Sequence, residues 1–254
     1  SVMGINTLMP ELTVVTNTIE NVGRIPVGLA FSPDGRKAYV VNGGENTVRV
    51  IDTATETVDD TLIGVGDQPQ EIAINSVGTR AYVTNYGGGT VSVIDLVTNT
   101  ELTKIIVGGN PNGIAVRPGD AEVYVVSPGN DTVSIIETST NSVARRLTRL
   151  EVGGSIGLIP QKVAFSPDGK QAFITNSLDF TVTIIDTETR DGRSTLFVGA
   201  ESFNDVINEP NGIFISPDGL RLYVSLFGRN GQGRYLGVFS GSTNRIQAFT
   251  EVGD

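Results

Sequence analysis

Four amide side chains stand at the same point of a recurring sequence pattern, directly after a proline. They are Gln70, Asn112, Gln161 and Asn211, while Val27 takes the corresponding place after an earlier proline. Because an amide both donates and accepts hydrogen bonds, such a set could bind a small ligand that carries hydroxyl or carbonyl groups. The alternative is that the amides satisfy exposed backbone groups and water.

A second set of candidate binding residues lies where the pattern is lengthened by extra residues. These carboxylate, basic and aromatic residues are Glu201, Phe203, Asp205, Arg229, Arg234 and Tyr235. Long loops on a rigid scaffold commonly carry recognition residues, so these side chains could form a contact surface for another protein. The alternative is that they are ordinary solvated side chains of surface loops.

The residue types most used in catalysis are either missing or too regularly repeated. The chain contains no cysteine and no histidine, which removes thiolate nucleophiles, imidazole bases and frequent ligands of zinc, copper and haem iron. The most regular carboxylates recur in turns and at strand ends, at Asp34, Asp52, Asp95, Asp168, Asp186 and Asp218. A catalytic pair needs one or two special positions, so we expect these aspartates to close local turns. We therefore predict no catalytic residue, no metal site and no cofactor.

The charge balance argues against two classes of partner. With 18 basic and 28 acidic residues the chain carries a net charge of −10 at pH 7, which disfavours nucleic acids and anionic membrane surfaces. No run of about 18 apolar residues is present, so no transmembrane segment is expected. The absence of cysteine is compatible with an oxidising compartment, and we expect an extracytoplasmic location after removal of a signal peptide.

The elements that would position these side chains follow from an internal repeat. Five prolines are separated by steps of 43, 42, 49 and 50 residues, and five aromatic residues follow them with the same steps, always 13 residues later. The prolines are Pro26, Pro69, Pro111, Pro160 and Pro210, and the aromatic residues are Tyr39, Tyr82, Tyr124, Phe173 and Tyr223. Self-similarity at nearly fixed spacing is typical of repeat folds.

Each repeat has the pattern of four short β-strands. The first strand ends in a turn such as Ser-Pro-Asp-Gly at 32–35, whose residues favour a tight hairpin. The second and third strands are β-branched and aromatic, as in Tyr-Val-Thr-Asn at 82–85 and Val-Ser-Val-Ile-Asp at 91–95. The fourth strand, for example 100–105, is more polar, as expected of an outer strand that faces water.

The Ser-Pro-Asp-Gly turn, the Tyr-Val-Thr-Asn strand and the Val-Ser-Val-Ile-Asp strand resemble the motifs of the YVTN-type, surface-layer-like β-propeller repeat family. The resemblance covers nearly the whole chain. The fifth repeat departs most, with Tyr-Val-Ser-Leu at 223–226. The resemblance implies a propeller fold and a bias toward surface-layer and exported proteins. Related propellers include lactonase-like and amine-dehydrogenase-like subunits.

We therefore predict a single all-β domain over 1–254, a β-propeller of four-stranded antiparallel blades. Five complete blades are expected at 26–64, 69–107, 111–152, 160–199 and 210–250, and 11–22 should supply the outer half of a sixth, in a ring of six or seven blades. The residues expected to be buried within or between blades are Leu29, Phe31, Val40, Val50, Ile72, Val83, Val93, Ile114, Val125, Ile135, Val163, Ile174, Ile184, Ile213 and Val224.

The leading functional hypothesis is a non-catalytic exported propeller that acts as a protein-binding or assembly subunit of a cell-surface or extracytoplasmic complex. A small ligand at the mouth of the central channel, bound by the amides, is a further possibility. The alternative hypothesis is a propeller subunit of an enzyme. That enzyme would be a lactonase-like hydrolase with a carboxylate-bound metal, or a redox complex whose cofactor is on another chain.

Overall fold

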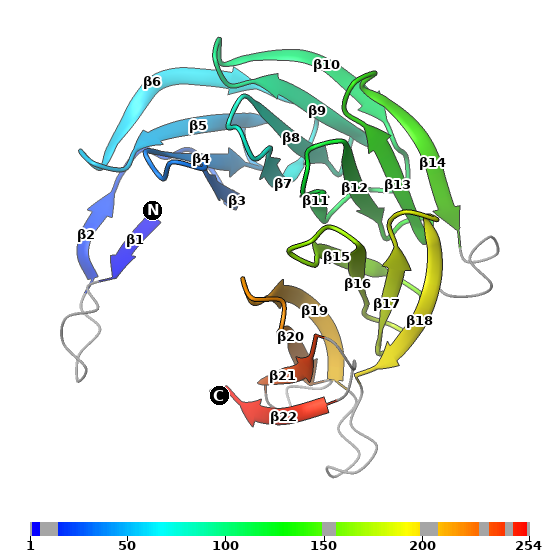
Figure 1. Ribbon diagram of the computed structural model, residues 1–254. Coiled ribbons are helices and arrows are strands. Elements are labelled where there is room, and N and C mark those ends of the chain that lie inside the picture. The colour runs from blue at the N-terminus through cyan, green and yellow to red at the C-terminus, as the bar shows by residue number, and fades with distance from the viewer. Residues whose placement is uncertain are drawn as a thin grey trace. The chain divides into compact units, whose positions relative to one another are not determined.

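The computed structural model describes residues 2–5, 15–148, 156–198, 208–228, 234–241 and 246–252. In these residues every regular element is a β-strand, arranged in five four-stranded antiparallel sheets and one two-stranded sheet (Figure 1). The predicted fold class is thereby confirmed. The described part of the chain has no helix that is long and apolar enough to cross a membrane. The chain divides into two compact units, 1–104 and 105–254, and the single domain over 1–254 stays a prediction.

The first unit holds the two-stranded sheet and two of the four-stranded sheets. The two-stranded sheet pairs β1 (Val2–Ile5) with β2 (Val15–Ile19). The first four-stranded sheet consists of β3 (Pro26–Phe31), β4 (Lys37–Asn42), β5 (Thr47–Asp52) and β6 (Thr57–Gly64). The second consists of β7 (Pro69–Ile74), β8 (Arg80–Asn85), β9 (Thr90–Asp95) and β10 (Thr100–Ile106), whose last two residues belong to the second unit.

The second unit holds the other three four-stranded sheets. The third sheet consists of β11 (Ile114–Val116), β12 (Glu122–Ser127), β13 (Thr132–Glu137) and β14 (Ser142–Thr148). The fourth consists of β15 (Pro160–Phe165), β16 (Gln171–Asn176), β17 (Thr181–Asp186) and β18 (Asp191–Phe197). The fifth consists of β19 (Asn208–Ile215), β20 (Arg221–Gly228), β21 (Arg234–Ser240) and β22 (Ile246–Glu251).

The prediction that 11–22 supplies both outer strands of the sixth blade is covered only in part by the described residues. Of these, 15–22 include β2, whose partner β1 comes from the first residues of the chain. Val22 and Gly23 lie four and three residues before Pro26, as Val65 and Gly66 lie before Pro69. By this spacing β2 corresponds to a fourth strand and β1 to a third strand.

The recurring aspartates hold turns, as their repetition suggests. The hydroxyl of Ser32 donates to Asp34 Oδ1 at 2.6 Å, and the backbone N–H of Arg36 donates to the same oxygen at 3.1 Å. These two hydrogen bonds lower the pKa of Asp34 below its ordinary value, and the bond from the Ser32 hydroxyl has the larger effect. Gly35 follows with a φ of +70°, a conformation that glycine adopts without strain. The same bond from serine to aspartate recurs at Asp168 and Asp218.

Neighbouring sheets within a unit pack face to face through apolar side chains. In the first unit, Tyr39, Val41 and Val50 of the first sheet pack with Ile72 and Val83 of the second. Equivalent clusters join the third sheet to the fourth and the fourth to the fifth in the second unit. Burial of this kind is the main stabilising contribution to stacked sheets.

Three residues of the predicted core depart from expectation. Leu29 and Phe31 are 45% and 57% exposed, and Ile213 is only half-buried, whereas the other residues predicted to form the core are buried. The strand pattern around Leu29 and Phe31 is correct, since both lie on β3. A side chain on a sheet is buried only where a second layer covers it, and in the part of the chain that the structure describes little covers Leu29 and Phe31.

Candidate functional site

Two of the four predicted amides come together in the second unit. Asn112 Nδ2 donates to Gln161 Oε1 at 2.9 Å, and Gln161 Nε2 donates to the hydroxyl of Ser177 at 3.4 Å. The Ser177 hydroxyl in turn donates to the carbonyl of Ile159 at 3.2 Å. This chain of bonds runs from one sheet to the next and ends on the backbone.

The other two amides stand apart from this chain of bonds. Asn211 is exposed on β19, where its backbone carbonyl accepts a bond of 2.8 Å from the hydroxyl of Thr175. Gln70 belongs to the first unit and is half-buried on β7. The backbone carbonyl oxygen of Gln70 would lie 2.5 Å from a Cβ placed on Gly28. The absence of a side chain at Gly28 therefore permits β3 and β7 to approach closely. The side-chain amides of Asn112 and Gln161 thus serve a contact between sheets, and ligand binding by the four amides stays a prediction.

Most of the predicted contact surface lies outside the described residues. This applies to Glu201, Phe203, Asp205 and Arg229. Arg234 begins β21, where its side chain is exposed and its backbone carbonyl accepts from the N–H of Val252 at 2.8 Å. Tyr235 is half-buried and packs against the apolar cluster between the fourth and fifth sheets. The contact surface as a whole stays a prediction.

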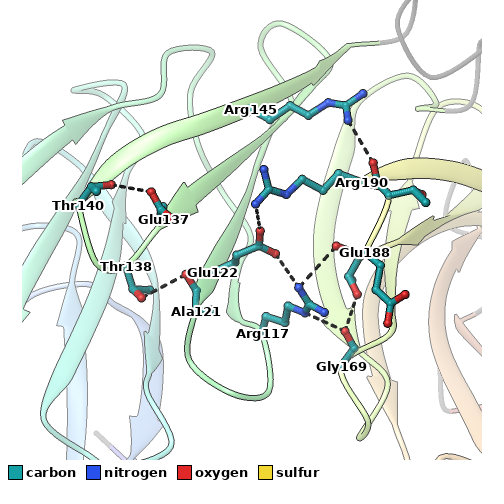
Figure 2. A network of polar contacts seen from close by, with 12 residues as sticks. Arg117, Ala121, Glu122, Glu137, Thr138, Thr140, Arg145, Gly169, Glu188 and Arg190 are labelled. Carbon is teal, nitrogen blue, oxygen red and sulfur yellow. Dashed lines mark hydrogen bonds and ion pairs between the residues drawn. The ribbon is translucent and has the colours of Figure 1, made fainter.

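A cluster of ionic residues that the sequence did not single out joins the third and fourth sheets (Figure 2). Glu122, the first residue of β12, is only 4% exposed. Its Oε2 lies 3.1 Å from Arg117 Nη1, and its Oε1 lies 2.5 Å from Arg190 Nη2. Both carboxylate oxygens are thus paired with a guanidinium.

Arg117 extends the cluster to the backbone of the fourth sheet. Its Nε donates to the carbonyl of Gly169 at 3.0 Å, and its Nη1 lies 3.5 Å from the carbonyl of Thr187. Further out, Arg145 on β14 donates to Asp191 on β18 at 2.9 Å and to the carbonyl of Thr189 at 3.2 Å. Figure 2 shows Arg117 and Arg145 reaching from the third sheet toward the fourth, and Arg190 reaching in the opposite direction toward Glu122.

The sequence did contain a signal for this cluster. Arg117 replaces the serine found at Ser32, Ser166 and Ser216, and Glu122 stands where other repeats have Lys37, Arg80, Gln171 and Arg221. The third repeat therefore differs from the others at two positions, Arg117 and Glu122, which carry opposite charges and are five residues apart. Residues that differ from the consensus of a repeat are the first candidates for a specific structural or functional role.

The chemistry available to this cluster is restricted by its pairing. Each oxygen of the Glu122 carboxylate is paired with an arginine of the protein, so the carboxylate is directed at the protein. Nearby Tyr124 is fully buried, and burial raises the pKa of its hydroxyl well above the ordinary value. Neither group presents a reactive atom to a substrate. The arrangement connects two sheets.

The described residues offer no fit for a carboxylate-bound metal. Nowhere in this part of the chain do three or more histidine, cysteine, aspartate or glutamate side chains gather closely enough to hold a metal ion. The carboxylates with lowered pKa accept hydrogen bonds from neighbouring serine, threonine or backbone groups, as Asp52 does from the N–H groups of Ala54 and Thr55. Apart from Asp59, which lies on β6, these carboxylates hold turns.

Comparison with known proteins places the fold within a family. The family described as "Lactonase, 7-bladed beta-propeller" matches residues 5–249. The chain belongs to this family. No curated protein matches it. Among solved structures, a chain of "Kuenenia stuttgartiensis Hydrazine Synthase" is similar, with a TM-score of 0.80 and 24% identity over 94% of this chain and 69% of that one. This second likeness concerns the fold alone.

Proposed function

We propose that this lactonase-family propeller is a non-catalytic subunit that binds another protein in a cell-surface or extracytoplasmic complex. The observation that carries the proposal is the exposure of large apolar side chains on regular strands of each unit. On β3 these are Val27, Leu29 and Phe31, and on β19 the side chain of Phe214 is 61% exposed. Exposed apolar patches of this kind typically mark protein–protein contacts.

The repeat shows that this exposure depends on the neighbouring sheet and on the residue type. Ile72 stands in the second repeat where Leu29 stands in the first, and Ile72 is 5% exposed. Phe214 stands where the other four repeats have an alanine, at Ala30, Ala73, Ala115 and Ala164. Its ring lies 6.5 Å from that of Tyr223, so two aromatic rings are grouped on the fifth sheet. Aromatic side chains often contribute most of the binding energy at an interface.

The extracytoplasmic location rests on two sequence features. One is the absence of cysteine, and the other is the resemblance of the repeat to those of surface-layer and exported proteins. The net charge of −10 favours a partner surface that is basic or neutral over one that is acidic. Cell fractionation followed by detection of the protein would test the location directly.

The binding role is tested by substituting the exposed apolar residues in the native host. We expect Phe31→Ser and Phe214→Ser, separately or together, to reduce the amount of co-purifying protein measured by size exclusion and mass spectrometry. Val97→Ser is a matched control, because Val97 is 77% exposed but lies in a turn and not on a strand. Unchanged co-purification in the double variant, with the melting temperature also unchanged, would contradict the binding role.

A second candidate function is favoured by the family match. Membership of a family named for lactonase activity supports a propeller that hydrolyses a lactone, or one that serves as a subunit of an enzyme. The purified chain should then open simple lactones in a pH-stat assay. Hydrolysis that scales with protein concentration, and survives repeated purification, would replace the binding role as the main function.

A further inference from the structure

A cavity of about 420 Å³ lies between the turns of the first and second sheets, within the first unit. The lining residues that matter here are Ser32, Asp34 and Tyr39 from the first sheet and Val77, Gly78 and Leu96 from the second. Asp34 is exposed and Val77 is 69% exposed, so the cavity opens to solvent. Its volume is in the range of small-ligand sites in proteins.

The third and fourth sheets, in the second unit, meet through the same turns. A Cβ placed on Gly78 of the second sheet would lie 3.0 Å from Pro33 of the first. A Cβ placed on Gly169 of the fourth sheet would lie 3.1 Å from Pro118 of the third. The two junctions can therefore be compared residue by residue.

At the junction of the third and fourth sheets, the corresponding place is filled by an arginine. Arg117 stands in its turn where Ser32 stands in the first sheet. The N–H of Arg117 donates to the carbonyl of Glu122 at 2.8 Å, and the N–H of Ser32 makes the equivalent bond at the same distance, so both turns have the same backbone. The Nε of Arg117 donates to the carbonyl of Gly169 at 3.0 Å (Figure 2). A guanidinium group thus occupies the place that is open beside Ser32.

The carbonyl of Gly78 lacks a donor that its counterparts have. In the first sheet the hydroxyl of Thr53 donates to the carbonyl of Gly35 at 2.6 Å, and the same bond recurs in the third and fourth sheets. In the second sheet Leu96 takes the place of this threonine and has no hydroxyl to donate. The carbonyl of Gly78 is therefore an acceptor at the wall of the cavity.

The charged residues around the cavity leave one carboxylate available. Hydrogen bonds, that from Ser32 first, lower the pKa of Asp34, so this carboxyl is ionised at neutral pH. Arg36 lies 3.9 Å from Asp34 Oδ2 and its side chain is 85% exposed, a loose contact that a ligand can replace. Lys37 stands where the third sheet has a glutamate, but it lies opposite Asp52, whose carboxylate balances its charge.

We propose that this cavity binds a guanidinium group, as the junction of the third and fourth sheets binds that of Arg117. The group would donate to the carbonyl of Gly78 and to the carboxylate of Asp34, beside Tyr39 and Leu96. A guanidinium has five N–H donors in one plane and can bond acceptors on two sheets at once, which an ammonium does less well. The inference does not rest on the proposed binding role, because its test needs no partner protein.

Three blocked amino acids test the site in the whole chain. N-acetyl-arginine amide presents a guanidinium, N-acetyl-lysine amide an ammonium of the same charge, and N-acetyl-citrulline amide a neutral group of similar shape. We expect only the arginine compound to shift the N–H signal of Thr79 saturably in NMR, because Thr79 shares its peptide group with the carbonyl of Gly78. A Kd of about 1 mM is expected for a small ligand held by few hydrogen bonds.

Two variants should weaken this binding. Ser32→Arg places the chain's own guanidinium in the cavity and should weaken binding at least about tenfold, the effect of losing a hydrogen bond to a charged group. Ser166→Arg is the matched control, since Ser166 bonds an aspartate in the same turn of the fourth sheet and the variant adds the same charge. Leu96→Thr gives the carbonyl of Gly78 a hydroxyl donor and should weaken binding about threefold. This variant tests the site even if Ser32→Arg does not fold.

Three results would overturn the proposal. One is the absence of a saturable shift with the arginine compound. Another is equal binding of the lysine or the citrulline compound. The third is binding that Leu96→Thr leaves unchanged and that Ser32→Arg changes no more than Ser166→Arg does.

The source of the guanidinium is decided by comparing a blocked Ala-Arg-Ala tripeptide with agmatine. Binding of the tripeptide at least as tight as that of agmatine indicates an arginine side chain of another protein. Tighter binding of agmatine indicates a free small molecule. Both results support the guanidinium site. The co-purification test with Phe214→Ser stands apart from them, so either proposal can fail alone.

Discussion

The first and second sheets of the first unit have nearly the same sequence pattern but different surroundings. Leu29 on β3 is 45% exposed, whereas Ile72 at the same position of β7 is 5% exposed. The second sheet has the first sheet against this face, whereas among the described residues the first sheet has residues of β2 and the segment after it there. The comparison shows that a repeat specifies the strands of a blade, while burial is a property of two neighbouring blades.

The same two sheets differ in their buried polar residues. In the second sheet Asn85 Nδ2 donates to the hydroxyls of Thr90 at 3.0 Å and Ser92 at 2.9 Å. The Ser92 hydroxyl also accepts from the N–H of Gly66 at 3.2 Å. In the first sheet arginine replaces this serine, as Arg49, and the corresponding bonds are absent among the described residues. Asn85 Oδ1 has no partner in the described residues either, so the contrast between the two sheets concerns the amide nitrogen, which has acceptors at Asn85 and none at Asn42.

The largest expected difference between the two sheets concerns their matched apolar residues. Ile72→Ala should lower the free energy of unfolding by about 2–5 kcal/mol, because it leaves a cavity between two sheets. Leu29→Ala should cost less than about 1 kcal/mol, because its side chain is largely in contact with water. Denaturant unfolding of both variants measures the difference. Equal losses would mean that Leu29 is covered in solution.

The next largest loss of stability is expected at Glu122 of the third sheet, where the first two sheets have the basic residues Lys37 and Arg80. Glu122→Ala should lower the free energy of unfolding by about 2–4 kcal/mol, since it leaves Arg117 and Arg190 without their shared carboxylate. The loss stays below the extreme for buried pairs because both arginines keep some contact with water. Glu137→Ala, at an exposed residue of the same sheet, is the control in thermal unfolding. A neutral Glu122→Ala would show that the cluster contributes nothing to stability.

A smaller effect is expected from the polar sets. Ser92→Ala should cost about 1–2 kcal/mol, because the buried amide of Asn85 and the N–H of Gly66 each lose an acceptor. Thr47→Val in the first sheet should be neutral or slightly stabilising, because it removes a buried hydroxyl that has no partner in the described residues. Chemical denaturation of both variants tests the contrast. A clear loss in Thr47→Val would reveal a partner for its hydroxyl.

The smallest effect concerns the turns after the first strands, which use different acceptors in the two sheets. In the first sheet the acceptor is the carboxylate of Asp34, whose pKa is lowered by the bond from Ser32 and then by that from Arg36. In the second sheet Asn75 Oδ1 accepts from the N–H groups of Thr79 and Arg80, both at 2.9 Å. A lowered pKa means that the ionised form stabilises the turn. This stabilisation is complete above the ordinary pKa of 3.8 and is lost as the pH falls through the lower folded value.

Amide NMR signals should report this difference on acidification. The N–H of Arg36 should shift as the pH falls below 3.8, because its acceptor becomes protonated, while the N–H of Arg80 should stay unchanged because an amide does not titrate in this range. An Asp34→Asn variant should remove the shift at Arg36. Equal shifts at both residues would point to a global acid transition instead.

Much of the fold could be predicted from the sequence because its signals are local. Strand positions follow from alternating side chains and turn residues within about ten residues of each other, and the four-stranded sheets fall close to the expected blade limits. The two-stranded sheet was placed less well, because β1 and β2 are joined by residues without the repeat motifs. The candidate site was harder to predict. The amides Asn112 and Gln161 are paired across 49 residues of sequence, and no local pattern shows which amides meet.

The sequence by itself determined the repeat, the all-β class, the turn role of the aspartates and the absence of cysteine and histidine chemistry. Only the tertiary structure decided that Glu122 meets Arg190 and that Leu29 is exposed where Ile72 is buried. The physical reason is the range of the interactions. Turns and strands depend on neighbours along the chain, whereas burial and ion pairing depend on which sheet lies beside which.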